Sequence, residues 1–344
     1  MIQKQSYTVR LLNIRWWKIN EYSNTGGTRE KFIVTSPKGE TYYFKKSLLK
    51  ENKDYKYEFW SEILGSYVGF LLGFKVVKYD LATNNDYIGC ISKSVISEYK
   101  NGVLIEGFGF VTQKYPDFKT NYKKTHSFQK IIETLKDQEF SYMIPDVIEM
   151  IIFDAIIGNS DRHSENWAVI VLNKVFKEYF TGLDNLSRIK IIILGLKILR
   201  KSKGKLTLRG VNKILRKRTH YFSTLYDNGS SLARELSDES ILKLIKNEDE
   251  FIKFNSKGKP DIRYNDKHLS HFDLIKTIKL DYPEYVDKTI LRIKLLYDKN
   301  ALKNFLDTFD DKTPKKFLSY KMPDTRKDFL LKYIDYRIKT IFEI

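Results

Sequence analysis

The first part of the chain shows the pattern of β-strands interrupted by one helix. Two runs rich in aromatic and β-branched residues, at 28–36 and 40–47, flank the turn-forming sequence PKG, so we predict a β-hairpin. The stretch 56–74 then carries apolar residues at helical spacing, with Phe59 and Ile63 on one stripe, which predicts a helix. Two further strands are predicted in the segments KVVKYDLA and YIGCISKSVIS.

The pattern becomes mostly helical in the second part of the chain. Helices are predicted at 127–140 and 144–158, followed by a polar stretch, a short strand, a basic segment, a second short strand at 220–228, and then mostly helix. This order predicts an α+β fold of two lobes with a cleft between them. The smaller, β-rich N-lobe is expected over residues 1–104 and the larger, helical C-lobe over 105–344.

Composition narrows the class of protein without assigning a function. The 344 residues are 42% hydrophobic and 14% aromatic, which is typical of a globular chain rather than a disordered one. The single cysteine, Cys90, excludes an internal disulfide and a thiolate metal cluster. The N-terminus lacks the features of a signal peptide and no apolar run is long enough to span a bilayer. We therefore expect a cytoplasmic protein with no integral membrane association.

The net charge of +18 is large and unevenly distributed. Between Arg188 and Arg218 there are 12 Lys or Arg residues and no Asp or Glu. This segment belongs to a basic insertion at about 173–220, whose apolar and basic residues indicate amphipathic helices. It is interpreted either as a platform for an acidic protein, RNA or a lipid surface, or as a solvated structural elaboration.

Candidate chemistry begins with the polar stretch GNSDRHSENW, which lies between a buried helix and a strand. Asp161 and Asn166 are five positions apart in this loop. Phosphoryl transfer in protein kinases uses this spacing, with an Asp that accepts the proton of the acceptor hydroxyl and an Asn that holds a metal ion. By itself the D-x-x-x-x-N pattern is common.

A metal-binding carboxylate is expected in the downstream stretch YDNGSS. Asp227 follows an apolar strand, and Gly229 stands where a D-x-G motif has its glycine. Carboxylate and amide oxygens suit Mg²⁺ that bridges ATP phosphates. Taken alone, the same residues favour a β-turn, because Asn-Gly is a strong turn dipeptide.

Two further features would complete a nucleotide-binding site: a lysine paired with a glutamate, and a phosphate-binding loop. The hairpin strand ends in Lys45 and Lys46, of which only one can face the cleft. We select Lys45, paired with Glu62 of the following helix rather than with Glu58. The alternative is that these are solvated surface charges.

A phosphate-binding loop is expected just before the first hairpin strand. Gly26 and Gly27 allow a close approach of the backbone, and Arg29 adds positive charge. Two glycines also commonly mark a turn. Five elements therefore follow one another along the chain: the glycine loop, the strand lysine, the helix glutamate, the loop with Asp161 and Asn166, and the segment with Asp227. Their order predicts an ATP-dependent phosphotransferase.

The blocks GNSDRHSENW and YDNGSSL resemble the HipA-like kinase family, especially its short single-chain members. The resemblance extends to GTREKFIV, YYFKK and EFWSEILGSYVGFLLGFKVVKYDLA, and covers most of the chain outside residues about 173–220. It implies a bilobal protein-kinase-like fold and serine/threonine phosphorylation of a protein substrate with ATP and Mg²⁺.

The resemblance also implies roles for individual residues. Asp161 corresponds to the catalytic base, Asn166 and Asp227 to the Mg²⁺ ligands, and Lys45 to the lysine that contacts phosphate. Arg162 and His163 are placed in the catalytic set with Asp161. His163 is interpreted either as orienting the loop or as touching phosphate, and a structural histidine hydrogen-bonded within the loop is an equal alternative.

Family members often autophosphorylate near the glycine loop, and here three hydroxyl residues occupy that neighbourhood: Ser23, Thr25 and Thr28. The family also implies a toxin-like role and an antitoxin-type partner. Two other functions stay open. One is a phosphoinositide-type lipid kinase, which shares the D-R-H-x-x-N order. The other is a non-catalytic kinase-fold protein that binds nucleic acid through the basic insertion.

Overall fold

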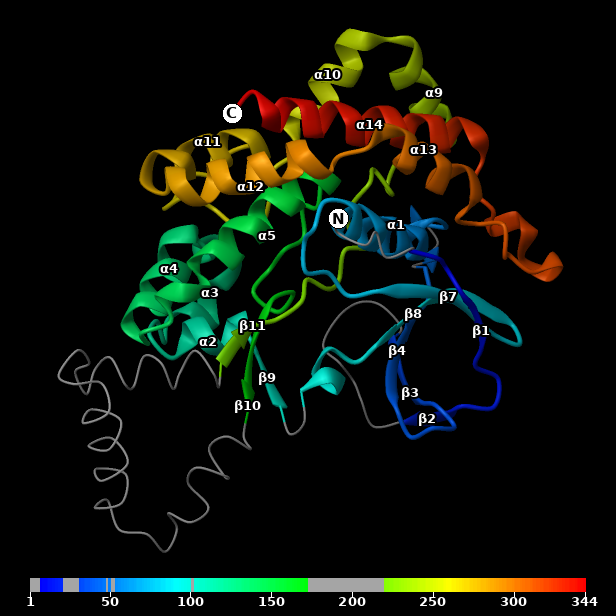
Figure 1. Cartoon of the computed structure of the whole chain (residues 1–344), viewed down its shortest axis with the longest axis horizontal. Coiled ribbons are helices and arrows are strands. Elements are labelled where there is room, and N and C mark those ends of the chain that lie inside the picture. Colours follow the sequence, from blue (N-terminus) through cyan, green and yellow to red (C-terminus); the bar gives the residue numbers. More distant parts are fainter. Residues whose placement is uncertain (1–6, 21–30, 48, 51–52, 100–101, 173–219) are drawn as a thin grey trace, which may run out of the picture. The chain divides into compact units, whose positions relative to one another are not determined.

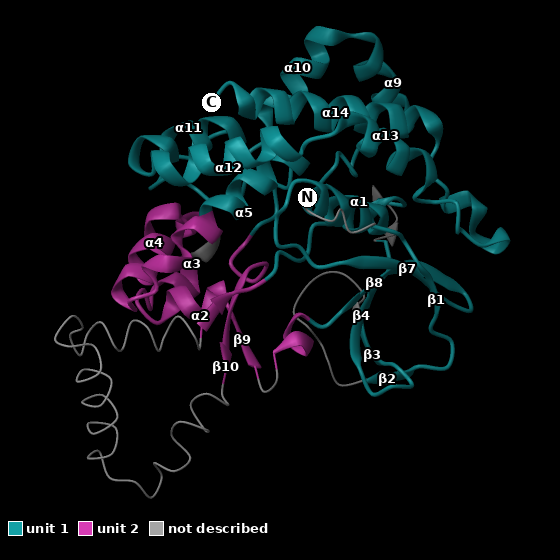
Figure 2. Ribbon diagram, in the orientation of Figure 1, with its two compact units in different colours: residues 1–94, 148–162, 224–344 teal, residues 95–147, 163–223 magenta. Residues whose placement is uncertain are grey.

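The computed structural model describes residues 7–20, 31–47, 49–50, 53–99, 102–172 and 220–344. The chain divides into two compact units (Figure 2). The first contains residues 1–94, 148–162 and 224–344, and the second contains residues 95–147 and 163–223. The expected lobe boundary at residue 104 stays a prediction.

A six-stranded sheet forms the β-part of the first unit (Figure 1). Its strand order is β1-β7-β8-β4-β3-β2, in which β1 and β7 pair in parallel and the other neighbours are antiparallel. The strands are β1 (Leu11–Asn13), β2 (Lys18–Asn20), β3 (Lys31–Thr35), β4 (Thr41–Lys45), β7 (Tyr79–Asn84) and β8 (Tyr87–Lys93). The predicted hairpin is confirmed as β3 and β4, and the positive φ of Gly39 (78°) allows its tight turn.

Helix α1 (Glu58–Leu71) is the predicted helix of this region and packs against β7 and β8. It is buried from Glu58 to Gly69, so both of its glutamates lie inside the protein. A cluster on the sheet contains Phe44, Ala82 and Ile91. A two-stranded ribbon precedes the helix, formed by β5 (Leu49–Lys50) and β6 (Lys53–Asp54).

The C-terminal part of the first unit is helical, as expected. Phe329, Ile334 and Ile338 of the last helix are fully buried. The elements are α9 (Asp238–Lys246), α10 (Glu248–Lys257), α11 (His271–Asp281), α12 (Pro283–Leu296), α13 (Lys299–Thr308), η3 (Lys315–Tyr320) and α14 (Asp324–Phe342). None of the helices in the described part of the chain is both long and apolar enough to cross a membrane.

The second unit combines a three-stranded antiparallel sheet with short helices. The sheet has the order β11-β10-β9. Trp167 lies in its core, in contact with Phe110 and Phe222. The elements are η1 (Val95–Glu98), β9 (Gly102–Glu106), α2 (Gly107–Thr112), α3 (Phe118–Thr125), α4 (Phe128–Asp137), η2 (Ser141–Met143), β10 (Ala168–Leu172) and β11 (His220–Phe222). Helix α5 (Ile144–Ile157) begins in this unit and continues into the first.

The strand predicted at 220–228 is shorter than expected. β11 ends at Phe222, and the chain then pairs only at Leu225, which forms an isolated bridge with Val76. The Leu225 amide donates to the Lys75 carbonyl, and the Val77 amide donates to the Leu225 carbonyl. The expectation that Asp227 ends a strand is therefore wrong, because the chain leaves the three-stranded sheet after Phe222.

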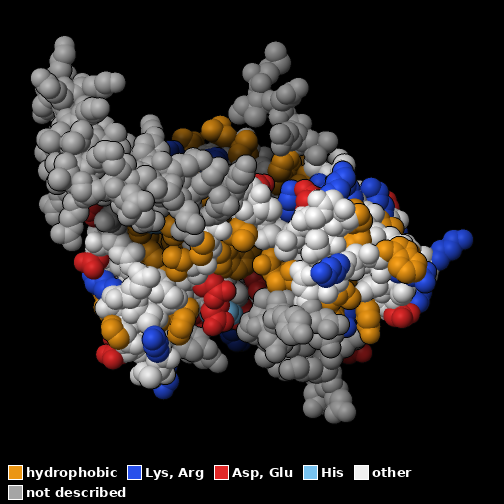
Figure 3. Space-filling model, turned by 90° about the horizontal axis from the view of Figure 1, so that it is seen from below, with side chains coloured by type: hydrophobic (Ala, Val, Ile, Leu, Met, Phe, Trp, Pro, Cys, Tyr) orange, Lys and Arg blue, Asp and Glu red, His pale blue; other side chains and the backbone are white. Residues whose placement is uncertain are grey.

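Charged side chains occur in separate groups on the face shown in Figure 3. In Figure 3, Lys and Arg side chains occur in several separate places on the face shown, and a group of Asp and Glu side chains lies near the middle of the view. The basic insertion at 173–220 falls outside the described residues except for its last position. Both interpretations of the insertion therefore stay predictions.

Candidate active site

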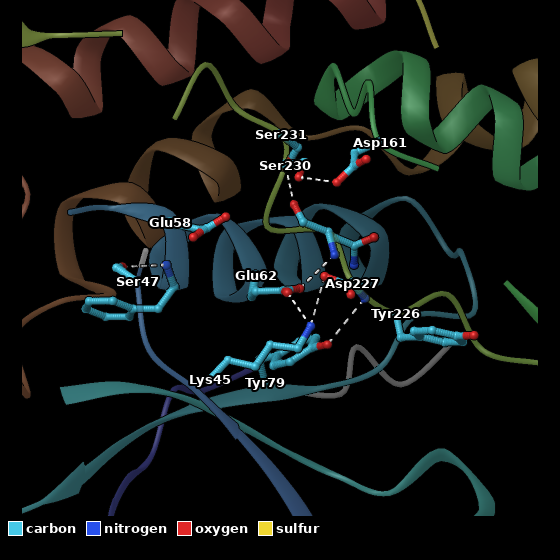
Figure 4. Close-up of polar contacts among 12 residues, drawn as sticks. Lys45, Ser47, Glu58, Glu62, Tyr79, Asp161, Tyr226, Asp227, Ser230 and Ser231 are labelled. Atoms are coloured by element: carbon cyan, nitrogen blue, oxygen red, sulfur yellow. Dashed lines mark hydrogen bonds and ion pairs between the residues drawn. The ribbon is translucent and has the colours of Figure 1, made fainter. Parts of the chain in front are cut away.

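Lys45, the last residue of β4, lies at the centre of a buried charge cluster (Figure 4). Its Nζ is 2.6 Å from Glu62 Oε1 and 3.1 Å from Asp227 Oδ1. Burial disfavours the ammonium, but the carboxylates of Asp227 and Glu62 outweigh this effect and raise the pKa of Lys45 well above its ordinary value. Lys45 is therefore a permanent cation held between two anions.

The neighbouring lysine points elsewhere, as strand alternation requires. Lys46 Nζ lies over the ring of Tyr87 at 3.9 Å and over that of Phe32 at 5.5 Å. Of the two lysines, the selected Lys45 is the one that lies beside Glu62 and Asp227.

Helix α1 contributes two buried glutamates, one turn apart. Glu62 uses both oxygens, because Oε1 accepts from Lys45 and Oε2 accepts from the Asn228 amide at 2.8 Å. Glu58 forms an ion pair with Arg234, which also stacks on the ring of Tyr55. The interpretation of these glutamates as surface charges does not fit their burial.

Asp227 lies in a loop whose backbone is held in unusual conformations. Its φ is 56°, and Leu232 and Ala233 also have positive φ values of 56° and 51°. Left-handed conformations at non-glycine residues are costly and cluster at functional sites. Tyr79 lies below this loop, where its hydroxyl accepts from the Asp227 amide at 3.4 Å. Burial raises the pKa of Tyr79, so it stays a neutral phenol.

Asp161 follows the sharp end of helix α5. Gly158 has a φ of 65°, and a Cβ there would lie 1.9 Å from the Tyr333 hydroxyl, so only glycine fits. The Asp161 amide donates to Asn159 Oδ1 at 3.1 Å. Its Oδ2 accepts from the Ser230 hydroxyl at 2.9 Å, which joins this carboxylate to the Asp227 loop (Figure 4).

Arg162 is fully buried behind the loop, where it holds backbone and side chains together. Its guanidinium forms a forked ion pair with Asp154 of α5 and donates to the Tyr226 carbonyl and to Asn228 Oδ1. Burial opposes its charge, but Asp154 raises the pKa of Arg162. Through these contacts Arg162 connects the loop that carries Asp161 to the segment that carries Asp227.

His163 and Asn166 belong to the second unit. The Asn166 amide donates to the His163 carbonyl at 2.9 Å, and the Glu165 amide donates to His163 Nδ1 at 3.3 Å. His163 thus stabilises its own turn, and Asn166 is 6% exposed. The glycine-loop residues Gly26, Gly27 and Arg29, and the hydroxyls at 23, 25 and 28, lie outside the described residues.

Several residues of this site are missing from the sequence-based prediction. Asp154 gives a signal, because it is the one charged residue in the apolar run IIFDAII. Asn228 and Ser230 are the two neighbours of Gly229 in the sequence. Tyr79 and Arg234 give no signal in the sequence, because their roles depend on contacts with residues more than a hundred positions away.

The donor set fits a metal shared with phosphates better than a metal held by protein alone. Among the described residues, no group of three or more His, Cys, Asp or Glu side chains is arranged to hold a metal ion. Mg²⁺ in phosphate-transfer sites is bound by one or two protein oxygens together with phosphates and water. The carboxylate of Asp227 is an oxygen donor of the type that this arrangement requires.

The mixed α+β fold, with its sheet, its buried helix α1 and its helical C-terminal part, is a kinase-like fold. The chain is similar to the crystal structure of a Helicobacter pylori proinflammatory kinase, CtkA, with a TM-score of 0.67 and 18% identity over 96% of this chain and 97% of that one. At this identity the likeness shows a shared fold.

A weaker likeness links the chain to Shewanella oneidensis HipA, solved with HipB and operator DNA. The TM-score is 0.46 and the identity 9%, over 100% of this chain and 70% of that one. A likeness of this size carries no further argument. No protein-family model matches the sequence, and the search of curated proteins found no match.

Proposed function

We propose that the protein is an ATP- and Mg²⁺-dependent serine/threonine protein kinase of the HipA type. The observation that carries the proposal is the buried triad of Lys45, Glu62 and Asp227. Protein kinases require a strand lysine paired with a helix glutamate, next to a carboxylate that holds Mg²⁺. The kinase-like fold supports the same activity.

The chemistry assigned to each residue follows from its position. Lys45 would bind the ATP phosphates, and Asp227 and Asn166 would hold Mg²⁺, which neutralises charge on those phosphates. Asp161 would accept the proton of the substrate hydroxyl. The hydroxyl oxygen would bond to the γ-phosphorus as the bond between that phosphorus and ADP breaks. Ser230, which donates to Asp161, would orient this carboxylate.

The substrate class and partners belong to the same proposal. We assign a protein substrate, autophosphorylation near the glycine loop, and a toxin-like role with an antitoxin-type partner. These rest on the resemblance of the motif blocks to HipA-like kinases. A phosphopeptide map without modification between Glu21 and Lys31 would count against the autophosphorylation site.

The two other functions have less support. A lipid kinase needs basic residues for the headgroup after the D-x-G motif, and the one such residue in DNGSSLARELSDES, Arg234, is already paired with Glu58. Nucleic-acid binding depends on the basic insertion, which lies outside the described residues except for its last position. We therefore retain the protein kinase as the proposed function.

Nucleotide binding tests the assignment of Asp227 apart from turnover. We expect the wild type to bind ATP in the presence of Mg²⁺, as measured by titration calorimetry, and Asp227→Ala to lose the Mg²⁺-dependent part of that affinity. Asp161→Ala should retain binding, because a base acts on the acceptor hydroxyl rather than on the nucleotide. Equal Mg²⁺-dependent binding by wild type and Asp227→Ala would contradict the assignment.

A further inference from the structure

Asn228, the middle residue of the D-N-G segment, connects two separate parts of the candidate site. Its backbone amide donates to Glu62 Oε2 at 2.8 Å, and its side-chain Oδ1 accepts from Arg162 Nη2 at 2.7 Å. Arginine can only donate, so this contact fixes which end of the Asn228 amide faces it. One fully buried residue therefore joins helix α1 to the loop that carries Asp161.

The packing around Asn228 shows that α1 is shaped to receive it. A Cβ on Gly65 of α1 would lie only 3.2 Å from the Asn228 Cβ and 3.8 Å from Ile157 Cδ1. The first of these two distances, to the Asn228 Cβ, is shorter than an ordinary van der Waals contact. The absence of a side chain at Gly65, one turn after Glu62, therefore lets Asn228 lie directly on the helix backbone.

The other end of the connection is rigid. Arg162 is held by the forked ion pair with Asp154 on α5 and by the Tyr226 carbonyl. Because Tyr226 and Asn228 flank Asp227, the same guanidinium holds the backbone on one side of the candidate metal ligand and a side chain on the other. A displacement of α1 would break the Glu62 contact with Asn228 while Arg162 keeps its own partners.

Stability alone does not explain an asparagine at this position. Its Nδ2 has no hydrogen-bond partner among the described residues, although it is buried. A buried donor without a partner is destabilising, and an apolar side chain of similar size would avoid that cost. In protein kinases the equivalent residue is a phenylalanine, whose apolar packing sets the active or inactive state.

We infer that Asn228 is a positioning residue that couples helix α1 to the catalytic loop through hydrogen bonds, in the place where other kinases use apolar packing. When both hydrogen bonds are made, Glu62 is held where it pairs with Lys45. The inference rests on the proposed function for its catalytic consequence, but its structural content can be tested without turnover.

The structural test is amide hydrogen exchange of the unliganded full chain. Asn228→Leu keeps the backbone amide that donates to Glu62 but removes the Arg162 contact that holds this amide in place. Exchange in α1 should therefore speed up by about tenfold or more, while exchange in α14 stays unchanged. Asn228→Asp keeps an acceptor for Arg162 and the backbone amide for Glu62, so α1 should keep its protection. The exposed Glu235→Gln serves as a matched control in the same loop. Unchanged α1 exchange in Asn228→Leu would overturn the inference.

The catalytic test uses the Gly65 contact. Gly65→Ala pushes Asn228 away by a few tenths of an ångström, so it and Asn228→Leu should each lower kcat by about tenfold or more. The double variant should be no worse than Asn228→Leu alone, because both disturb one connection. Independent, multiplying effects would overturn the coupling. If the wild type is inactive while α1 exchange responds as expected, the proposed function fails and the coupling stands.

Discussion

Lys45 carries a charge inside the protein, and its surroundings explain why this is tolerated. The side chain is 9% exposed and lies between Glu62 and Asp227. A buried charge is stable only when it is paired, and removing one partner leaves the other charges uncompensated. The same arrangement places Asp227 next to the Lys45 ammonium. This proximity is required if both residues act on the same phosphates.

Replacement of this lysine should therefore affect stability as well as nucleotide binding. Lys45→Met leaves two buried carboxylates without their cation, and we expect the free energy of unfolding to fall by about 3–5 kcal/mol. Lys46→Met, a matched change one residue along, should alter it by less than about 1 kcal/mol. Urea unfolding of the two variants measures the difference. A larger loss in Lys46→Met would reverse the assignment.

His271 predicts how stability depends on pH. Burial, with Arg337 nearby, lowers the pKa of His271 well below its ordinary value, and neither ring nitrogen has a hydrogen-bond partner among the described residues. Below about pH 6.5 the unfolded chain binds a proton that the folded protein does not, so stability falls as pH falls. This histidine contributes up to about 1.4 kcal/mol per pH unit to that slope.

Substitution isolates this contribution from that of the carboxylates. In His271→Leu the free energy of unfolding should fall less steeply between pH 6.5 and pH 5 than in the wild type, by the slope of about one proton. The exposed Leu280→Ala on the same helix is the control, because it removes no titratable group, and it should keep the wild-type slope. Parallel pH profiles for wild type and His271→Leu, from urea unfolding at each pH, would show that His271 is not responsible.

At the scale of elements, the turn after α5 decides where Asp161 lies. Gly158→Ala introduces a side chain where φ is 65° and where the Tyr333 hydroxyl is 1.9 Å from the new Cβ. We expect a loss of about 2–4 kcal/mol, from the left-handed backbone and from overpacking. Tyr333→Phe in the same chain should recover part of it, as judged by urea unfolding. Full stability in Gly158→Ala alone would contradict the described turn.

The elements that could be predicted are those with local signals. Strand alternation and the turn sequence predict the β3–β4 hairpin and separate Lys45 from Lys46, and helical spacing predicts α1 and α5. The end of β11 could not be predicted, because Leu225 is removed from the strand by pairing with Val76, almost 150 positions earlier. The contacts of Asn228 and Arg234 with α1 depend on the same kind of long-range packing.

At the scale of the whole molecule, the candidate site gathers residues from distant parts of the sequence. The first unit is assembled from three stretches of chain, and Lys45, Glu62, Asp161 and Asp227 come from all three. Their order along the sequence is what allowed the set to be recognised. The positive charge between Arg188 and Arg218 gave no comparable constraint, because charge alone does not specify a partner.

The central claim is phosphate transfer with Asp161 as the base. Intact-protein and peptide mass spectrometry after incubation with ATP and Mg²⁺ tests it most directly, with Asp161→Ala, Asp227→Ala and Lys46→Met in parallel. We expect wild type and Lys46→Met to gain phosphate, and Asp161→Ala to lose about two to four orders of magnitude in rate. An equal gain in wild type and Asp161→Ala would contradict the assigned base. No gain by the wild type, together with no binding of ATP and Mg²⁺, would contradict the kinase itself.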